Sequence, residues 1–239
     1  MAIMYRLHMS ALHTISERRA KMILKIKGDI VSNEMKEIYD WFGYDCTTPK
    51  DVLDAIEEMP KGDRLQVKIN SGGGDVLAGQ EIYSVLRSRS DVDIEVEGLA
   101  ASAASVIAMA GKSTISPVGM LMIHDVSVSF TSGNHAQLSK QAETLKAWDE
   151  ALASAYIEKT GKSKDEIIQM MDAETWITAD KAVEMGFIDA ISQSGQSVIT
   201  NNMGNLKITD EMIQQYTAEK AGIEEEKNNL LKDLDKFGA

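Results

Sequence analysis

Two segments of this sequence carry residues that could perform acyl transfer. Ser102 lies among small residues in the uncharged stretch 98–111, and His124 ends the apolar run at positions 120–123. A serine becomes a nucleophile when a base can reach its hydroxyl and N–H donors can hold the oxyanion that follows. A helix beginning near Ser102 would point its first free N–H groups at that charge. A tightly packed Ala/Ser helix and a structural histidine remain the alternative interpretation.

A third candidate segment is the glycine run 72–74, which follows an expected strand at 65–69. It does not match a phosphate loop, because no G-x-x-x-x-G-K-[ST] is present and Leu77 stands where G-x-G-x-x-G requires glycine. Glycines allow backbone N–H groups to face a substrate carbonyl, so the run could form part of an oxyanion hole. A flexible loop is the other interpretation.

An alternation of strands and helices must position these residues. The hydrophobic periodicity predicts strands at 22–27, where Gly28 stops the strand, and at 65–69 and 93–97. It predicts helices at 49–59, capped by Thr48, and after the glycine run. This order indicates an α/β fold with a largely parallel sheet. The carboxyl ends of parallel strands meet at one edge, where the glycine run, Ser102 and His124 would converge.

The second half of the chain is predicted to be mostly helical. A long helix is expected at 136–159, and a capping box at Ser163 and Glu166 opens the next one. Thr178 is expected to cap a helix at 179–185, and a strand at 187–191 closes the domain. The domain limits that we predict are an N-terminal arm at 1–21, a catalytic domain at 22–191, a linker at 192–207 and a charged C-terminal helix at 208–239. Apolar residues recur every seven positions in that helix, which indicates a weak coiled coil or a solvated tail.

Composition narrows the classes of partner and compartment. The chain has 239 residues and a net charge of −12, which disfavours nucleic acid and anionic membranes. Its one cysteine, Cys46, cannot form a disulfide within the chain, and this favours a reducing compartment such as the cytoplasm. Four histidines show no metal-ligand spacing, so we expect no metal and no cofactor. No apolar run of membrane-spanning length and no secretory signal is predicted.

Four groups of residues, in a fixed order between positions 22 and 191, resemble one known family. This family is that of ClpP, the proteolytic subunit of Clp protease, and the resemblance is strongest to its phage-type members. It implies a ClpP/crotonase-like spiral of ββα units with a protruding long helix, assembled as a homo-oligomeric ring, a heptamer or a double heptamer. The matching groups are Ile69-Asn70-Ser71-x-Gly73-Gly74, Gly98-x-Ala100-Ala101-Ser102, Met122-Ile123-His124 and Ala179-x-x-Ala182-Val183-x-x-Gly186-x-Ile188-Asp189.

The resemblance also implies a role for individual residues. Ser102 would be the nucleophile and His124 the general base. The backbone N–H groups of Gly74 and Ala103 would form the oxyanion hole. The acid of the family stands two residues before an aromatic residue, which places Glu174 in that role, with Asp172 as the competing candidate. A glutamate can orient a histidine as an aspartate does.

Three departures from the family pattern concern regulation. Gly72 and Val126 stand where the family usually has proline, and Ala173 stands where it often has an arginine that couples rings. These differences put the double-ring regulation and the docking of an ATPase unfoldase in doubt. They leave the hydrolytic chemistry in place.

The resulting hypothesis is a serine endopeptidase of a phage or prophage that matures the head by cleaving scaffold or capsid protein. It would act in the bacterial cytoplasm or within the prohead. The charged C-terminal helix motivates the viral assignment. The alternatives are a host-type ClpP subunit that works with an ATPase unfoldase, a crotonase-type acyl-CoA enzyme, and an inactive structural ring protein.

Overall fold

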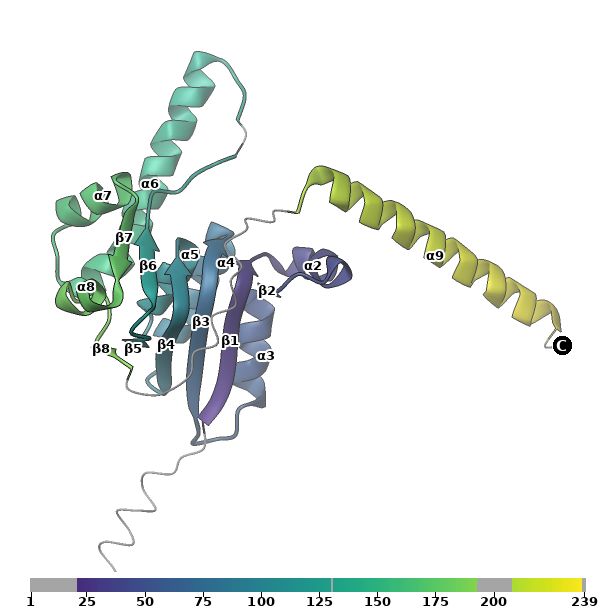
Figure 1. Cartoon of the computed structure of the whole chain (residues 1–239). Helices are drawn as coiled ribbons and strands as arrows, with labels where there is room; N and C mark the ends of the chain where they lie inside the picture. The colour runs from purple at the N-terminus through teal and green to yellow at the C-terminus, as the bar shows by residue number, and fades with distance from the viewer. Residues whose placement is uncertain (1–20, 130, 193–207, 238–239) are drawn as a thin grey trace, which may run out of the picture.

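A single twisted sheet organises the chain in this computed structural model, which describes residues 21–129, 131–192 and 208–237. The strands follow the order β2-β1-β3-β4-β5-β8, while β6 pairs with β4 and β7 (Figure 1). Every pairing is parallel except that of β6 with β7. The largely parallel α/β sheet is therefore confirmed. The predicted arm at 1–21 lies outside the described residues except for Lys21, and the predicted linker at 192–207 does so except for Ser192.

The centre of the sheet consists of β1 (Lys21–Ile30), β3 (Arg64–Gly74) and β4 (Val92–Ala101). Their alternate side chains are buried, as expected of strands with one face on the core. The prediction that Gly28 ends the first strand is wrong. Gly28 has φ 65°, and the pairing of β1 with β3 shifts register there and then continues to Ile30. The glycine residue allows the bulge without ending the strand.

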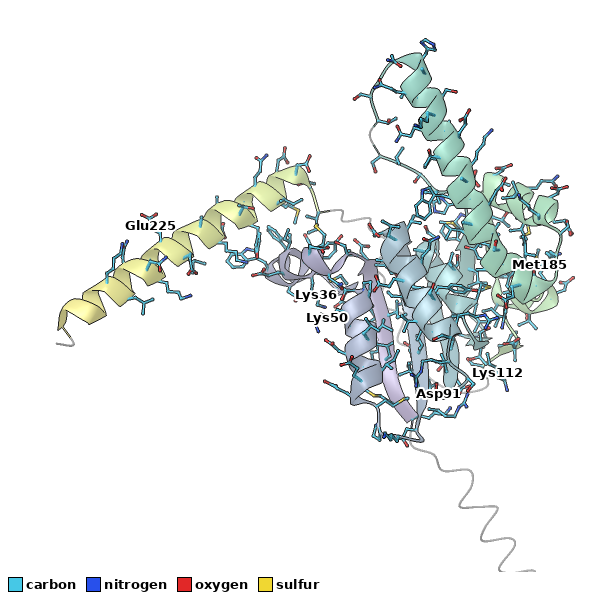
Figure 2. All side chains as sticks on the ribbon, turned by 180° about the vertical axis from the view of Figure 1, so that it is seen from behind. Lys36, Lys50, Asp91, Lys112, Met185 and Glu225 are labelled. Carbon is cyan, nitrogen blue, oxygen red and sulfur yellow. The ribbon has the colours of Figure 1, made fainter. Side chains whose placement is uncertain are left out.

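Helices α3 (Pro49–Glu58), α4 (Val76–Arg87) and α5 (Ala103–Ala108) lie on one side of the sheet (Figures 1 and 2). The predicted cap of α3 is confirmed, because the Thr48 side chain accepts a hydrogen bond from the Asp51 backbone N–H and Asp51 bonds back to Thr48. Asp75 caps α4 by accepting a hydrogen bond from the Ala78 N–H at 2.8 Å. The capping side chains of Thr48 and Asp75 therefore fix the residue at which each helix begins.

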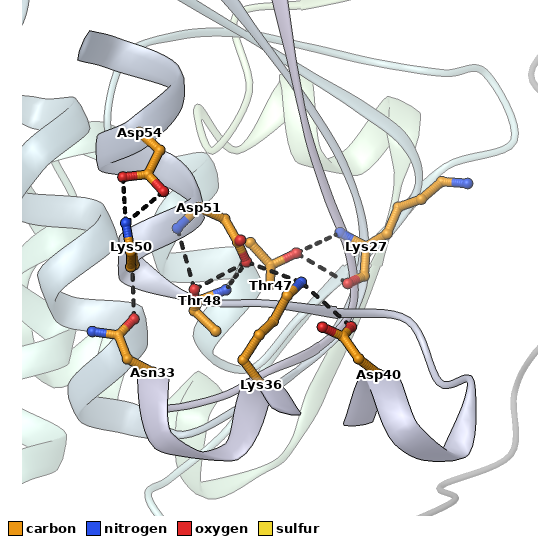
Figure 3. Close-up of polar contacts among 9 residues, drawn as sticks. All are labelled: Lys27, Asn33, Lys36, Asp40, Thr47, Thr48, Lys50, Asp51 and Asp54. Carbon is orange, nitrogen blue, oxygen red and sulfur yellow. Dashed lines mark hydrogen bonds and ion pairs between the residues drawn. The ribbon is translucent and has the colours of Figure 1, made fainter. Parts of the chain in front are cut away.

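A short segment that the periodicity did not predict closes the β1 edge of the sheet. It comprises the 3-10 helix η1 (Asn33–Met35), α2 (Lys36–Phe42) and β2 (Cys46–Thr47). The Thr47 hydroxyl accepts from the Lys27 N–H and donates to the Lys27 carbonyl, as Figure 3 shows. The Lys36 ammonium lies 3.8 Å from Asp40 and 3.4 Å from Asp51. The bonds between Thr47 and Lys27 and the pair of Lys36 with Asp51 join residues distant in sequence, so this segment depends on the tertiary structure.

The second half of the domain adds the protruding helix and the last strands. The prediction of α6 (His135–Thr160) is confirmed, and this helix rises beyond the sheet (Figure 1). The Ser163–Glu166 capping box of α7 is confirmed as well. Thr178 is the N-cap residue of α8, as predicted, but its side chain makes no capping hydrogen bond. The other elements here are β5 (Lys112–Ile115), β6 (Met120–Ile123), α7 (Lys164–Asp172), β7 (Thr175–Thr178), α8 (Ala179–Glu184) and β8 (Ala190–Ile191).

The first half of the charged helix α9 (Asp210–Phe237) contacts α2 of the domain. The Tyr216 ring packs edge-on against Trp41 of α2 at 5.5 Å, and the Lys220 ammonium pairs with Glu37. The remainder extends away from the domain, with Glu225 on it in Figure 2. The coiled coil stays a prediction. Among the described residues, no helix combines the length and apolar character needed to cross a membrane.

Candidate active site

Ser102 occupies a strained turn between β4 and α5. Its backbone has φ 54° and ψ −126°, a conformation that costs a non-glycine residue about 1–3 kcal/mol and is typical of functional sites. The Ser102 N–H donates to the Met122 carbonyl at 2.9 Å. Its carbonyl accepts from the Ser105 and Val106 N–H groups at 2.9 and 3.3 Å. The strand-to-helix turn predicted at Ser102 is thus present and is held from both sides.

His124 reaches Ser102, the predicted nucleophile, from the end of the neighbouring strand. Its Nε2 lies 2.8 Å from the Ser102 Oγ. The pairing of β4 with β6 sets this distance, because Ala101 lies opposite Met122 and both functional residues follow within two positions. The structure therefore brings together the two residues that the sequence proposes as nucleophile and base.

The glycine run is the end of β3 and not a flexible loop. Gly73 and Gly74 pair with Asp29 and Ile30 of β1. Gly73 has φ 96°, and a Cβ on it would lie 2.7 Å from both the Ala101 carbonyl oxygen and the Ser102 Cβ. Only a residue without a side chain allows β3 to approach the nucleophile turn this closely.

Gly74 and Ala103, the two predicted oxyanion donors, line the same hollow as Ser102 and His124. Ala103 is the first residue of α5, and the N–H groups of a first helical turn have no acceptor within their helix. The hollow is open to the solvent, and about 470 Å³ of space, part of it solvent outside the protein, lies within its limits. Its other walls are Val76, Gly79, Gln80, Val106, Asp125, Val126, Ser127, Leu152 and Tyr156.

The structure does not join Glu174, the predicted acid, to His124 by a hydrogen bond. Glu174 is exposed, has φ 47°, and its Oε1 accepts from the Trp176 indole N–H at 3.4 Å. The backbone nevertheless places it nearby. Ile123 pairs with Thr175, so the next residues along these antiparallel strands are His124 and Glu174. Both residues lie just beyond the last pair of this ladder. Its role as the acid stays a prediction.

A buried carboxylate that the sequence analysis missed lies near His124, the predicted base. Asp149 of α6 is 9% exposed, and its Oδ1 accepts from the Val126 N–H at 2.6 Å. Burial raises the pKa of Asp149, whereas the Val126 N–H and the nearby His124 act to lower it. A signal was present in the sequence, because Asp149 stands on the apolar face of its helix between Leu145 and Leu152.

Asp125 extends this cluster of carboxylates, and Asp172 lies beside it. Burial, together with the charges of Asp149 and Asp172, raises the pKa of Asp125 to about 6. Its Oδ1 is buried without a hydrogen-bond partner among the described residues. Asp172, the competing acid candidate, therefore interacts with Asp125 in this structure. Ionising Asp125 costs the native state free energy, since the unfolded chain holds this proton less tightly.

Changing Asp125 to Asn is expected to alter the dependence of stability on pH. The stability contributed by protonated Asp125 is present at about pH 4, the ordinary aspartate pKa, and is lost as the pH rises through about 6. The free energy of unfolding of Asp125→Asn, relative to the parent, should therefore rise between these pH values and stay level above them. Urea unfolding at several pH values measures it. Glu143→Gln, at an exposed position of α6, is the control. A constant difference for Asp125→Asn would contradict the raised pKa.

Comparison with known proteins decides the family. The sequence profile of the Clp protease family matches residues 49–195 of this chain. The chain belongs to the Clp protease family. This membership agrees with the strained Ser102, the adjacent His124 and the glycine-containing strand end, and it establishes a serine-type endopeptidase.

Curated Clp protease subunits and one solved structure resemble the chain. The ATP-dependent Clp protease proteolytic subunit 1 of Chlamydia abortus is 29% identical over 174 residues, covering 68% of this chain and 91% of that protein. Proteolytic subunit 2 of Corynebacterium diphtheriae is 32% identical over 141 residues, which cover 57% of this chain and 70% of that protein. The structure of the ClpP1 N165D mutant from Listeria monocytogenes superposes with a TM-score of 0.59 at 21% identity. The match covers 72% of this chain and 92% of that one. The last comparison confirms the ClpP-like fold.

The match to the Clp protease family also bears on the alternative functions that the sequence left open. It favours a peptidase over a crotonase-type acyl-CoA enzyme, for which Ser102 and His124 would have no function. These relatives are bacterial Clp subunits, so the phage assignment stays a prediction. Among the described residues, no group of histidine, cysteine, aspartate and glutamate side chains is arranged to hold a metal ion.

Proposed function

We propose that this peptidase cleaves peptide bonds by covalent catalysis at Ser102. His124 takes the hydroxyl proton, and the Ser102 oxygen attacks the peptide carbonyl. The Gly74 and Ala103 N–H groups stabilise the oxyanion, and His124 then returns the proton to the departing amine. Water, activated by the same histidine, releases the acyl group and restores the serine. The observation that carries the proposal is the 2.8 Å separation of His124 Nε2 and Ser102 Oγ.

Covalent labelling tests this mechanism. A fluorophosphonate probe should modify the full-length protein at one residue, which peptide mass spectrometry would assign to Ser102. Labelling at another serine, or none under conditions where a peptide substrate is cleaved, would overturn the assignment.

We propose Glu174 as the acid that supports His124 during the reaction. A rotation of the Glu174 backbone out of its left-handed conformation would carry its carboxylate from Trp176 toward the base. Glu174→Gln should lower kcat about 10³-fold, because a neutral amide cannot stabilise the imidazolium that forms. Asp172→Asn is the matched comparison and should lower kcat less than about threefold. The assignment is wrong if Asp172→Asn, or an equivalent Asp149→Asn, carries the large loss instead.

The substrate class that we propose is phage scaffold or capsid protein, cleaved during head maturation by a homo-oligomeric ring. Its support is the charged helix α9, which follows the peptidase domain and extends away from it (Figure 1). Such a helix is suited to contact another assembling protein. Cleavage of a co-expressed scaffold or capsid protein by the full chain, and its loss on removal of α9, would support this substrate.

The relatives named ATP-dependent Clp protease subunits favour a second candidate, a peptidase that works with an ATPase unfoldase. Incubating the ring with a Clp unfoldase, ATP and a folded substrate separates the two. Strong ATP-dependent stimulation would support the second candidate and defeat head maturation. Sedimentation of the same preparation measures the size of the ring, for which we propose a heptamer or a double heptamer.

A further inference from the structure

A buried pair of hydroxyl groups lies directly beneath the nucleophile turn. The Ser105 Oγ is 2.6 Å from the Ser102 carbonyl oxygen and 2.8 Å from the Tyr156 hydroxyl. Ser105 is fully buried, and Tyr156 is 2% exposed. These two residues come from α5 and α6, and the catalytic steps proposed above use neither of them.

The direction of both hydrogen bonds follows from the acceptor at one end. A carbonyl oxygen only accepts, so the single hydroxyl proton of Ser105 is directed to the Ser102 carbonyl. The Tyr156 hydroxyl must then be the donor to Ser105. Burial raises the pKa of Tyr156, so this hydroxyl stays protonated and keeps donating at neutral pH. The two bonds form one chain that ends on the backbone of the nucleophile.

This chain acts on a residue held in an unfavourable conformation. Ser102 has φ 54°, and its carbonyl accepts the Ser105 hydroxyl in addition to two N–H groups of α5. Strained residues persist only where surrounding contacts over-determine them. Buried hydrogen bonds in a linked network reinforce each other in a low dielectric. The bond from Ser105 therefore opposes relaxation of the turn, and Tyr156 holds the Ser105 hydroxyl in place.

We propose that Tyr156 is a positioning residue that, through Ser105, holds the Ser102 backbone so that the Ser102 hydroxyl stays within reach of His124. This inference rests on the proposed nucleophilic role of Ser102. It assigns α6 a role in the reaction besides forming a wall of the hollow. A Tyr156 that only packed the core would act through its ring, which lies edge-on to Phe187 at 6.0 Å, and not through its hydroxyl.

The test removes the hydroxyl group of Tyr156 or Ser105 and keeps the remainder of each side chain. Tyr156→Phe and Ser105→Ala should each lower the rate of fluorophosphonate labelling and the kcat for a short fluorogenic peptide by about tenfold, with KM changed less than twofold. The double variant should be no slower than the slower single variant, because both substitutions break one chain. Tyr216→Phe is the matched control. It deletes the hydroxyl of another largely buried tyrosine, which accepts a hydrogen bond from the Lys220 ammonium at 2.9 Å on α9, and it should leave kcat unchanged.

Three outcomes would overturn the inference. Unchanged rates in Tyr156→Phe would show that the hydroxyl has no positioning role. An effect on KM alone would assign Tyr156 to the substrate-binding wall, and multiplying effects in the double variant would show that the two residues act independently. Failure of the proposed function looks different, because the parent protein itself would then show neither cleavage nor labelling at Ser102, and the positioning role would fall with it.

Discussion

Replacing Ser102 by alanine is expected to abolish both peptide cleavage and fluorophosphonate labelling, with a loss in kcat of about 10⁴-fold or more. Without the Oγ, no atom of the site can form the acyl intermediate, and only the oxyanion donors and substrate binding remain. The fold should survive, since an alanine at this position keeps the backbone bonds of the turn to Met122, Ser105 and Val106. A fluorogenic peptide assay and a labelling gel measure the two losses.

The control for this substitution is Ser139→Ala, at an exposed position of α6. It should label and cleave as the parent does. Retention of more than about 1% of parental activity by Ser102→Ala, in a preparation free of contaminating peptidase, would contradict the nucleophile assignment. An equal loss in both variants would indicate a general effect on the ring and would contradict it too.

Replacing Gly73 by alanine is expected to damage the site almost as severely without removing any chemical group. The new Cβ would lie 2.7 Å from the Ala101 carbonyl oxygen and the Ser102 Cβ, and 3.0 Å from the Ala103 nitrogen. These neighbours are mostly backbone, so the turn itself must move. We expect labelling at Ser102 to slow about 100-fold and the free energy of unfolding to fall by about 2–4 kcal/mol. Labelling kinetics and urea unfolding measure the two effects.

The neighbouring Gly72 provides a matched control in the same strand. A Cβ at Gly72 meets nothing within 4 Å, and its φ lies outside the left-handed region. Gly72→Ala should therefore change the free energy of unfolding by less than about 0.5 kcal/mol and labelling by less than about threefold. Similar behaviour of the two variants would show that close approach at Gly73 does not shape the nucleophile turn.

Local sequence patterns were sufficient to predict most of the helices and strands. The strand–helix alternation from 49 to 101 was predictable because apolar periodicity and capping residues act over a few positions. The short helix α2 was missed, since it is stabilised by distant partners such as the bond from the Tyr39 hydroxyl to Asp29. The four-residue strand β5 was missed because it is too short to show a period and is stabilised by pairing with β4.

The residues of the candidate site also divide into those that local sequence predicted and those that it did not. Ser102 and His124 stand next to recognisable strand ends, so motif and order were enough to propose them. Asp149 and Tyr156 are 25 and 54 positions along the chain from His124 and Ser102, near which they lie, and no local pattern relates such distant positions. Glu174, directly before β7, has a left-handed backbone with φ 47°, which the ordinary preference of a glutamate does not predict.

The sequence by itself therefore determined the α/β class, the family, and the serine and histidine pair, because these depend on short-range periodicity and on motifs carried by adjacent residues. Only the tertiary structure decided that the glycine run is a strand end, that Asp149 is buried beside the base, and that Tyr156 reaches the nucleophile turn through Ser105. Burial and the electrostatic environment of a group depend on what packs against it, and that is settled only when distant segments meet.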